Sequence, residues 1–300
     1  MRLRRFVLVG AIAAAAAVLA IAVRSFVRAR GYVHMRRAVV SADAEATARG
    51  RLPGMQRVTL RTSDGLRLQG WFAPGAQRAA VILVHGGGAN RMQLLDEACL
   101  FSRHGYGVLV YDSRANGESD GATVTWGDGE QRDVSAALDY VSARPDVDPG
   151  RIAVLGFSIG ASSVAMATSG DSRARAVILY ATWSSFEAEI KQKFRRYGPL
   201  SWWPALYAMR GAGIEPHNIR PLDALKRISP RPLLMIAGVL DDDTPVAIMQ
   251  TLFATAGEPK ELWVVPRAGH GGVFAAAPAE YETRVVGFLD HALLGIEAPR

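Results

Sequence analysis

The sequence contains a single cysteine, Cys99, among its 300 residues, so an intrachain disulfide bond is excluded. It also lacks any pair of histidines or cysteines at the spacing of a metal site, and we expect no bound metal. No G-x-G-x-x-G motif is completed, and no Gly-Lys-Ser/Thr follows a glycine-rich loop, so we expect no nucleotide or other cofactor. Any chemistry is therefore expected to come from side chains and the backbone.

Acidic residues are absent from residues 1–37, where eight arginines lie. The whole chain carries a net charge of +7, so the remaining residues carry a net charge of −1. A nucleic-acid-binding module carries its positive charge on a folded face, and this nearly neutral body therefore predicts no nucleic-acid partner. Hydrophobic residues make up 49% of the chain and charged residues 21%, which is typical of a globular fold.

Residues 6–23 contain no charged side chain and lie between Arg5 and Arg24. A helix of that length spans about 27 Å, close to the thickness of a bilayer core. We therefore expect residues 1–23 to form an N-terminal membrane anchor, with membrane contact through residues 6–23. A signal segment cleaved after Ala20-Ile21-Ala22, followed by secretion, is the alternative. Arginines flank the run on both sides, so the orientation stays open.

Residues 24–55 resemble a polar juxtamembrane helix or linker, and a regular pattern starts beyond them. Two short alternating segments, 57–61 and 66–72, surround Ser63-Asp64-Gly65 and predict a β-hairpin. Continuous apolar runs of strand length follow, as in strands that are buried on both faces of a parallel sheet. They lie at residues 79–84, 107–111, 152–155, 176–180, 233–237 and 262–265. Helical patterns separate them, so residues 56–296 predict a doubly wound, mostly parallel α/β sheet.

About fifty residues separate the strand ending at residue 181 from the strand starting at residue 233, and an insertion of this length usually has its own structure. Aromatic side chains alternate there with lysines and arginines. We predict that residues 182–231 form a helical cap over the carboxyl edge of the sheet. The aromatic side chains either form the cap's own core or contact an amphipathic substrate.

Ser158 is the predicted nucleophile. The strand 152–155 leads directly into Gly156-Phe157-Ser158-Ile159-Gly160, and a helix of small residues follows. A strained strand-to-helix turn exposes the serine oxygen, and glycines are needed because side chains beside the turn would collide with it. The N–H of the residue after the serine can stabilise an oxyanion.

A serine hydroxyl needs a base and an orienting acid, which follow late strands in this kind of architecture. His270 stands on the glycine-flanked loop after the last predicted strand, and Asp241 directly follows the strand before it. We expect the neighbouring Asp242 and Asp243 to cap the helix that starts near Pro245. Between the third strand and the next helix, residues 85–90 form a glycine-rich loop that can supply a second oxyanion donor, with His85 as a structural residue.

These motifs resemble the α/β-hydrolase superfamily over residues 57–294. Within it the chain is similar to the membrane-anchored Bem46-like hydrolases and, more distantly, to the catalytic domains of prolyl oligopeptidase and dienelactone hydrolase. The resemblance implies a triad of Ser158, Asp241 and His270. It also implies backbone oxyanion donors at Ile159 and at Gly87 or Gly86. Ala115 departs from the glycine usual in the family's D-x-R-G-x-G-x-S turn, which is structural.

Three functions are compatible with the sequence. The first is a serine hydrolase that forms an acyl-enzyme from an ester or thioester; its reactants are water and a small acyl compound, and an amphipathic acyl compound is one candidate. The second is an aminopeptidase acting on short peptides, in which Glu187, Glu189 or Glu215 of the cap holds the substrate amine. The third is an inert, membrane-anchored binding scaffold. No obligate protein partner is evident.

Overall fold

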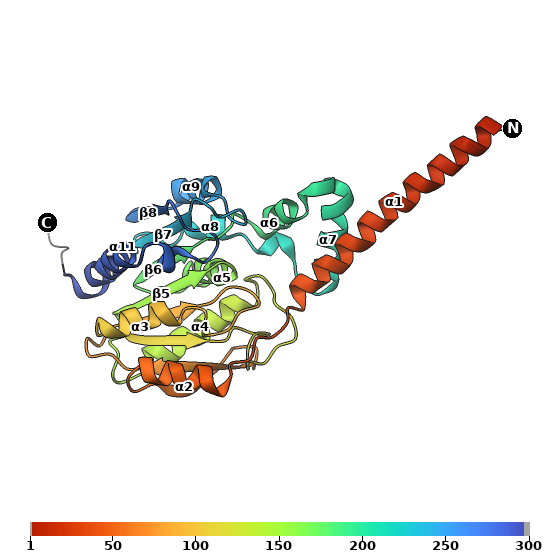
Figure 1. Cartoon of the computed structure of the whole chain (residues 1–300). Helices are drawn as coiled ribbons and strands as arrows, with labels where there is room; N and C mark the ends of the chain where they lie inside the picture. Colours follow the sequence, from red (N-terminus) through yellow and green to blue (C-terminus); the bar gives the residue numbers. More distant parts are fainter. Residues whose placement is uncertain (1, 297–300) are drawn as a thin grey trace.

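A computed structural model describes residues 2–296 and contains one eight-stranded sheet (Figure 1). The strand order is β1-β2-β4-β3-β5-β6-β7-β8. The strands are β1 (Gln56–Arg61), β2 (Arg67–Ala73), β3 (Ala80–Val84), β4 (Gly107–Tyr111), β5 (Ile152–Phe157), β6 (Ala176–Tyr180), β7 (Leu233–Gly238) and β8 (Lys260–Val265). β2 pairs antiparallel with β1 and β4, and all other neighbours are parallel. This confirms the predicted doubly wound, mostly parallel sheet.

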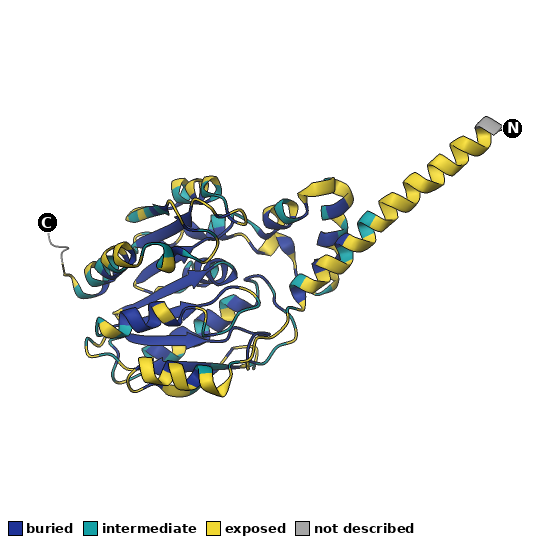
Figure 2. Ribbon diagram, in the orientation of Figure 1, coloured by how far each residue is buried: buried dark blue, intermediate teal, exposed yellow. Residues whose placement is uncertain are grey.

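Every residue of β3, β4, β5, β6 and β7 is buried, which explains why these strands are continuous apolar runs (Figure 2). Helices cover both faces of the sheet, and each face has its own apolar core. One face packs against α2 (Ala42–Arg51), α3 (Leu95–Arg103), α10 (Val273–Ala276), α11 (Pro278–Tyr281) and α12 (Gly287–Leu289). The other packs against α4 (Glu130–Ser142), α5 (Ile159–Thr168), α8 (Pro221–Leu225) and α9 (Val246–Thr255).

The long helix α1 (Arg2–Val33) projects from the body, and most of its outer part is exposed (Figures 1 and 2). It is long and apolar enough to cross a membrane and is a candidate membrane span. Met1, the first residue of the predicted anchor, lies outside the described residues. The helix continues beyond the predicted anchor into the predicted juxtamembrane segment as far as Val33, and Phe26, Ala29 and Val33 form a stripe at helical spacing that packs on the cap.

The segment between β6 and β7 is helical, as predicted for the cap. It contains α6 (Phe186–Lys193) and α7 (Pro199–Gly211), and α7 packs along the second half of α1. The aromatic side chains divide between two environments: Phe186 and Phe194 are buried in the apolar cluster that also contains Ala29 and Val33 of α1, whereas Trp203 and Tyr207 are exposed. The cap therefore shares a small apolar core with α1 and the loop before α4, and it has a separate aromatic surface.

Candidate active site

Ser158 lies on a sharp turn between β5 and α5 at the carboxyl edge of the sheet. Its backbone has φ 55° and ψ −118°, a conformation that residues other than glycine rarely adopt. The Ser158 N–H donates to the Tyr180 carbonyl at 2.9 Å, which holds the strained residue against β6. The turn places the hydroxyl above the sheet at the amino end of α5, as the sequence motif predicts.

The two glycines of this motif are required by close backbone contacts. A Cβ on Gly156 would lie 2.5 Å from the Gly160 carbonyl oxygen. A Cβ on Gly160 would collide with the carbonyl oxygens of Val84 and His85 in the loop after β3. The helix that follows Ser158 therefore packs directly against the loop that carries the predicted oxyanion donors.

The structure brings Ser158, His270 and Asp241 into one chain of hydrogen bonds. His270 Nε2 lies 3.0 Å from Ser158 Oγ, and His270 Nδ1 lies 2.8 Å from Asp241 Oδ2. The other carboxylate oxygen of Asp241 accepts backbone N–H groups of Asp243 at 2.9 Å and Thr244 at 2.7 Å. An ionised carboxylate only accepts, so Nδ1 carries the hydrogen and Nε2 faces the serine as an acceptor.

Burial fixes this arrangement. The Asp241 side chain is fully buried, whereas that of His270 is 28% exposed and reachable from the cavity. The His270 ring packs on Phe157, with the ring centroids 5.0 Å apart. Tyr180 holds the same loop, because its hydroxyl donates to the Gly269 carbonyl at 3.3 Å and accepts the Val273 N–H at 3.1 Å.

The prediction that Asp242 and Asp243 cap the next helix was wrong. α9 begins after Pro245, and no side chain caps it. Asp243 instead accepts a hydrogen bond from Lys193 of the cap at 3.0 Å. It faces the cap because Asp241 folds the loop back by accepting two of its N–H groups.

Of the predicted oxyanion donors, Gly86 is excluded because its N–H already donates to Gln93 Oε1 at 2.7 Å. Within residues 2–296, the N–H groups of Gly87 and Ile159 find no acceptor, and both residues line the same cavity as Ser158. His85 holds the loop as predicted: its Nδ1 donates to the Gly86 carbonyl at 2.6 Å and its Nε2 accepts the Ser113 N–H at 3.0 Å. Burial lowers the pKa of His85, which favours this neutral form.

A cavity of about 200 Å³ opens above Ser158 and His270. Its walls come from the sheet edge, the cap and, unexpectedly, the end of α1 and the residues after it. Aromatic and apolar side chains form one side, namely Tyr32, Met35, Trp126, Ile159 and Trp183. Charged and polar side chains form the other, namely Glu189, Lys193, Asp243 and Thr244.

The charged side of the cavity is a network centred on Lys193. Its ammonium lies 3.0 Å from both Glu189 Oε1 and Asp243 Oδ1. Burial alone would lower the pKa of Lys193, but the two carboxylates outweigh burial and raise it. Burial raises the pKa of Glu189, whose side chain is 3% exposed. Glu189 Oε2 is buried without a hydrogen-bond partner among residues 2–296.

Sequence reasoning missed the contribution of the N-terminal segment to this cavity. Backbone hydrogen bonds attach it to the loop before α4, since the Val124 N–H donates to the Val33 carbonyl at 2.9 Å. The Trp126 indole N–H also donates to the Tyr32 carbonyl at 3.2 Å. The helical spacing of Phe26, Ala29 and Val33 was the signal that this segment packs on the fold rather than serving as a linker.

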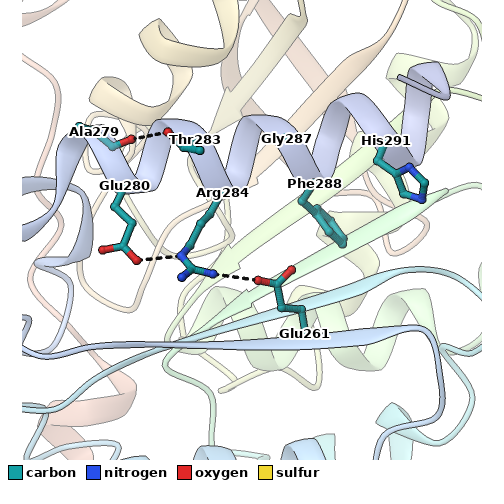
Figure 3. A pocket seen from close by; sticks show the side chains of 8 residues that line it. All are labelled: Glu261, Ala279, Glu280, Thr283, Arg284, Gly287, Phe288 and His291. Carbon is teal, nitrogen blue, oxygen red and sulfur yellow. Dashed lines mark hydrogen bonds and ion pairs between the residues drawn. The ribbon is translucent and has the colours of Figure 1, made fainter. Parts of the chain in front are cut away.

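A larger hollow of about 680 Å³ lies elsewhere, between β8 and the carboxyl-terminal helices (Figure 3). Arg284 points across it and pairs with Glu280 at 2.8 Å and Glu261 at 3.3 Å. None of the predicted site residues lines it, and its charges are paired with one another. Among residues 2–296, no group of three histidine, cysteine or acidic side chains is placed to hold a metal ion.

Comparisons with known proteins agree with this architecture. The sequence profile of the X-Pro dipeptidyl-peptidase (S15) family matches residues 27–227, more than half of the chain. The match begins within α1 and ends before Asp241 and His270. An uncharacterized protein of Mycobacterium tuberculosis (strain H37Rv) is 33% identical over 233 residues, 77% of each chain.

Solved structures show the same fold. The esterase Pf2001 of Pyrococcus furiosus superposes with a TM-score of 0.72, at 24% identity, over 87% of this chain and all of the other. The α/β hydrolase GrgF from Penicillium sp. sh18 superposes with a TM-score of 0.68, at 24% identity, over 81% of this chain and all of the other.

Proposed function

Because the chain belongs to the X-Pro dipeptidyl-peptidase (S15) family and is a hydrolase of the α/β-hydrolase type, we propose that it is a serine hydrolase that cleaves esters or thioesters. The hydrogen-bond chain Ser158–His270–Asp241 carries this proposal. Its geometry matches a nucleophile, a base and an orienting acid.

The reaction follows from the positions of these groups. Ser158 Oγ attacks the substrate carbonyl carbon while His270 Nε2 takes the hydroxyl proton. The N–H groups of Gly87 and Ile159 donate to the oxyanion that forms. His270 then gives its proton to the leaving alcohol or thiol, and water releases the acyl group from Ser158 by the reverse route. Asp241 holds the imidazole and stabilises its charged form.

The apolar wall of the cavity supports an acyl substrate with an apolar chain. Tyr32, Met35 and Trp183 offer a surface on which such a chain can pack, beside the serine. A chain-length series of aryl esters tests this proposal. We expect kcat/KM to rise from acetate to a longer acyl group; activity on acetate alone, or indifference to length, would contradict it.

Labelling with a fluorophosphonate tests the serine mechanism directly. The wild type is expected to label, and Ser158→Ala is expected to lose the label. Ser162→Ala is the matched control, since Ser162 is buried in α5 only four residues away and its hydroxyl makes no hydrogen bond within residues 2–296. A wild type that fails to label would instead favour the inert scaffold.

A peptidase is the second candidate, and Glu189 is the observation that favours it. Of Glu187, Glu189 and Glu215, only Glu189 lines the cavity, and its unpartnered Oε2 can accept a donor from a substrate. The family profile also describes a peptidase. However, Lys193 lies beside Glu189 and would repel a substrate ammonium. Ester or thioester hydrolysis therefore remains the first proposal.

Paired substrates separate the two candidates. Hydrolysis of an X-Pro p-nitroanilide that is lost in Glu189→Gln but kept in Glu187→Gln would favour the peptidase. Ester hydrolysis without any anilide hydrolysis would favour the esterase. Glu187 is a matched control because it lies on the same helix, pairs with Lys191 at 2.7 Å and does not line the cavity.

We also propose that α1 is a retained membrane anchor and not a cleaved signal. The continuity of the helix from the uncharged run into the cap core supports this proposal. The full chain is expected to stay in the membrane fraction after alkaline carbonate extraction. Recovery of a soluble chain that starts near Val23 would support the signal alternative.

A further inference from the structure

A basic pocket of about 80 Å³ lies where α1 meets the cap, outside the catalytic cavity. Arg24 and Arg28 of α1 and Lys193 and Arg196 of the cap line it, together with the buried Ser201. None of the lining residues is acidic. Lys193 is paired with carboxylates, whereas none of the three arginines forms an ion pair within residues 2–296. The pocket is therefore a concentration of uncompensated positive charge that can bind an anion.

The position of this pocket relative to the candidate span identifies the anion. The uncharged run ends at Val23, so Arg24 is the first charge beyond about 27 Å of helix, and the proposed anchoring by α1 would bring it to the depth of lipid phosphates. A separate apolar groove lies between α1 and α7 and is lined by Val23 and by the exposed Trp203 and Tyr207. Tryptophan and tyrosine are enriched at the membrane–water interface. The end of the uncharged run and the exposed aromatic side chains are both features expected where α1 and α7 meet a bilayer surface.

We propose that this pocket binds the phosphate of an anionic phospholipid, with the aromatic face of α7 lying in the headgroup region. The inference rests on the proposed anchoring by α1, but not on the catalytic role of Ser158. Guanidinium groups suit this ligand because they form paired, charge-assisted hydrogen bonds with phosphate oxygens.

The pocket also shares a wall with the catalytic cavity. Lys193 lines both spaces. Arg28 reaches the same wall, because its guanidinium donates to the Tyr32 hydroxyl at 3.1 Å and stacks over the Phe194 ring at 5.4 Å. A lipid whose phosphate is bound in this basic pocket therefore lies next to the proposed site of acyl transfer.

Binding of a fluorescent phosphatidylglycerol to the full chain in detergent micelles, followed by polarisation, tests the pocket. The triple variant Arg24→Gln, Arg28→Gln, Arg196→Gln is expected to bind at least tenfold more weakly, an estimate from three lost phosphate contacts. The control triple variant Arg61→Gln, Arg103→Gln, Arg175→Gln removes the same charge from exposed arginines elsewhere and is expected to bind within about twofold of the wild type. Equal losses in both, or none in the first, would overturn the proposal.

Competition identifies the source of the phosphate. Short-chain phosphatidylglycerol is expected to displace the probe at lower concentration than short-chain phosphatidylcholine or inorganic phosphate. Inorganic phosphate that competes as well as the lipid would overturn the lipid assignment. Thermal unfolding of the same samples shows that the variants are folded, and fluorophosphonate labelling tests Ser158 separately. Absent labelling in every sample, with the lipid result intact, would refute the serine mechanism and leave this pocket standing.

Should the triple variant fail to fold, Arg24→Gln alone provides the test. Arg24 is an exposed position on α1, so its replacement removes charge and little packing. We expect it to weaken phosphatidylglycerol binding by about threefold, and unchanged binding would count against the pocket.

Discussion

Replacement of Glu97 with glutamine is expected to stabilise the protein at alkaline pH and to leave its stability almost unchanged at acidic pH. Glu97 lies in α3 and is 8% exposed, although most carboxylates remain in water. Burial raises the pKa of its carboxyl from 4.5 to about 7, and the nearby Asp96 adds to the rise. The folded protein therefore keeps a proton on Glu97 that the unfolded chain has already released.

The sign and size of the effect follow from this difference in proton binding. Between about pH 4.5 and about pH 7 the folded state binds more protons, so the free energy of unfolding falls as the pH rises. The rise of the pKa from 4.5 to about 7 corresponds to a loss of about 3 kcal/mol in the free energy of unfolding. The loss is complete above about pH 7 and does not occur below about pH 4.5. Glutamine cannot ionise, and Glu97→Gln therefore removes this loss at high pH.

Thermal unfolding of the full chain in detergent at pH 5 and pH 8.5 measures the effect. For a chain of this size, about 3 kcal/mol raises Tm by about 5 °C, so Glu97→Gln should exceed the wild type by that amount at pH 8.5 only. Glu258→Gln is the control, since the side chain of Glu258 is 76% exposed. An equal Tm difference at both pH values would show that packing, and not ionisation, decides the effect.

Three further results are expected at the site. Asp241→Asn should retain the fold but lower kcat on an aryl ester by about three to four orders of magnitude, because the histidine loses its orienting acid; a decrease of less than tenfold would argue against that role. Gly160→Ala should abolish fluorophosphonate labelling and lower Tm, because its methyl group meets two carbonyl oxygens, whereas Gly170→Ala, with open space around it, should do neither. Glu189→Gln should leave fluorophosphonate labelling of the serine unchanged, and loss of labelling would show that Glu189 supports the nucleophile itself.

The sheet and its order of elements could be predicted because they depend on local patterns. β3 and β5 are uniformly apolar since both their faces are buried. The turn at Ser158 can be recognised in the sequence because backbone contacts leave room only for glycine at residues 156 and 160. The expected chain order also placed His270 and Asp241 after the right strands. These features need no knowledge of distant contacts.

The choice between oxyanion donors could not be made in this way. Gly86 and Gly87 are adjacent, and either N–H satisfies the sequence pattern. Their difference depends on Gln93, whose side chain accepts the Gly86 N–H and leaves that of Gly87 without an acceptor among residues 2–296. The Gln93 side chain, seven residues after Gly86, thus determines which N–H group can serve as the oxyanion donor, and the glycine pattern does not include Gln93. For the same reason, the contact of Asp243 with Lys193 of the cap could not be predicted, because Lys193 lies fifty residues earlier in the chain.

The role of α1 extends this argument from single contacts to the whole N-terminal segment. Its charge and hydropathy predict a membrane anchor up to residue 23. They do not reveal that Phe26, Ala29 and Val33 form a stripe that packs against the cap. Cleavage after Ala22 would leave that stripe in place, so the cavity would keep its wall at Tyr32 and Met35 even in a secreted chain. The segment therefore belongs to the proposed active site whether or not the span is retained. The anchor and the proposed catalytic cavity are joined through one continuous helix.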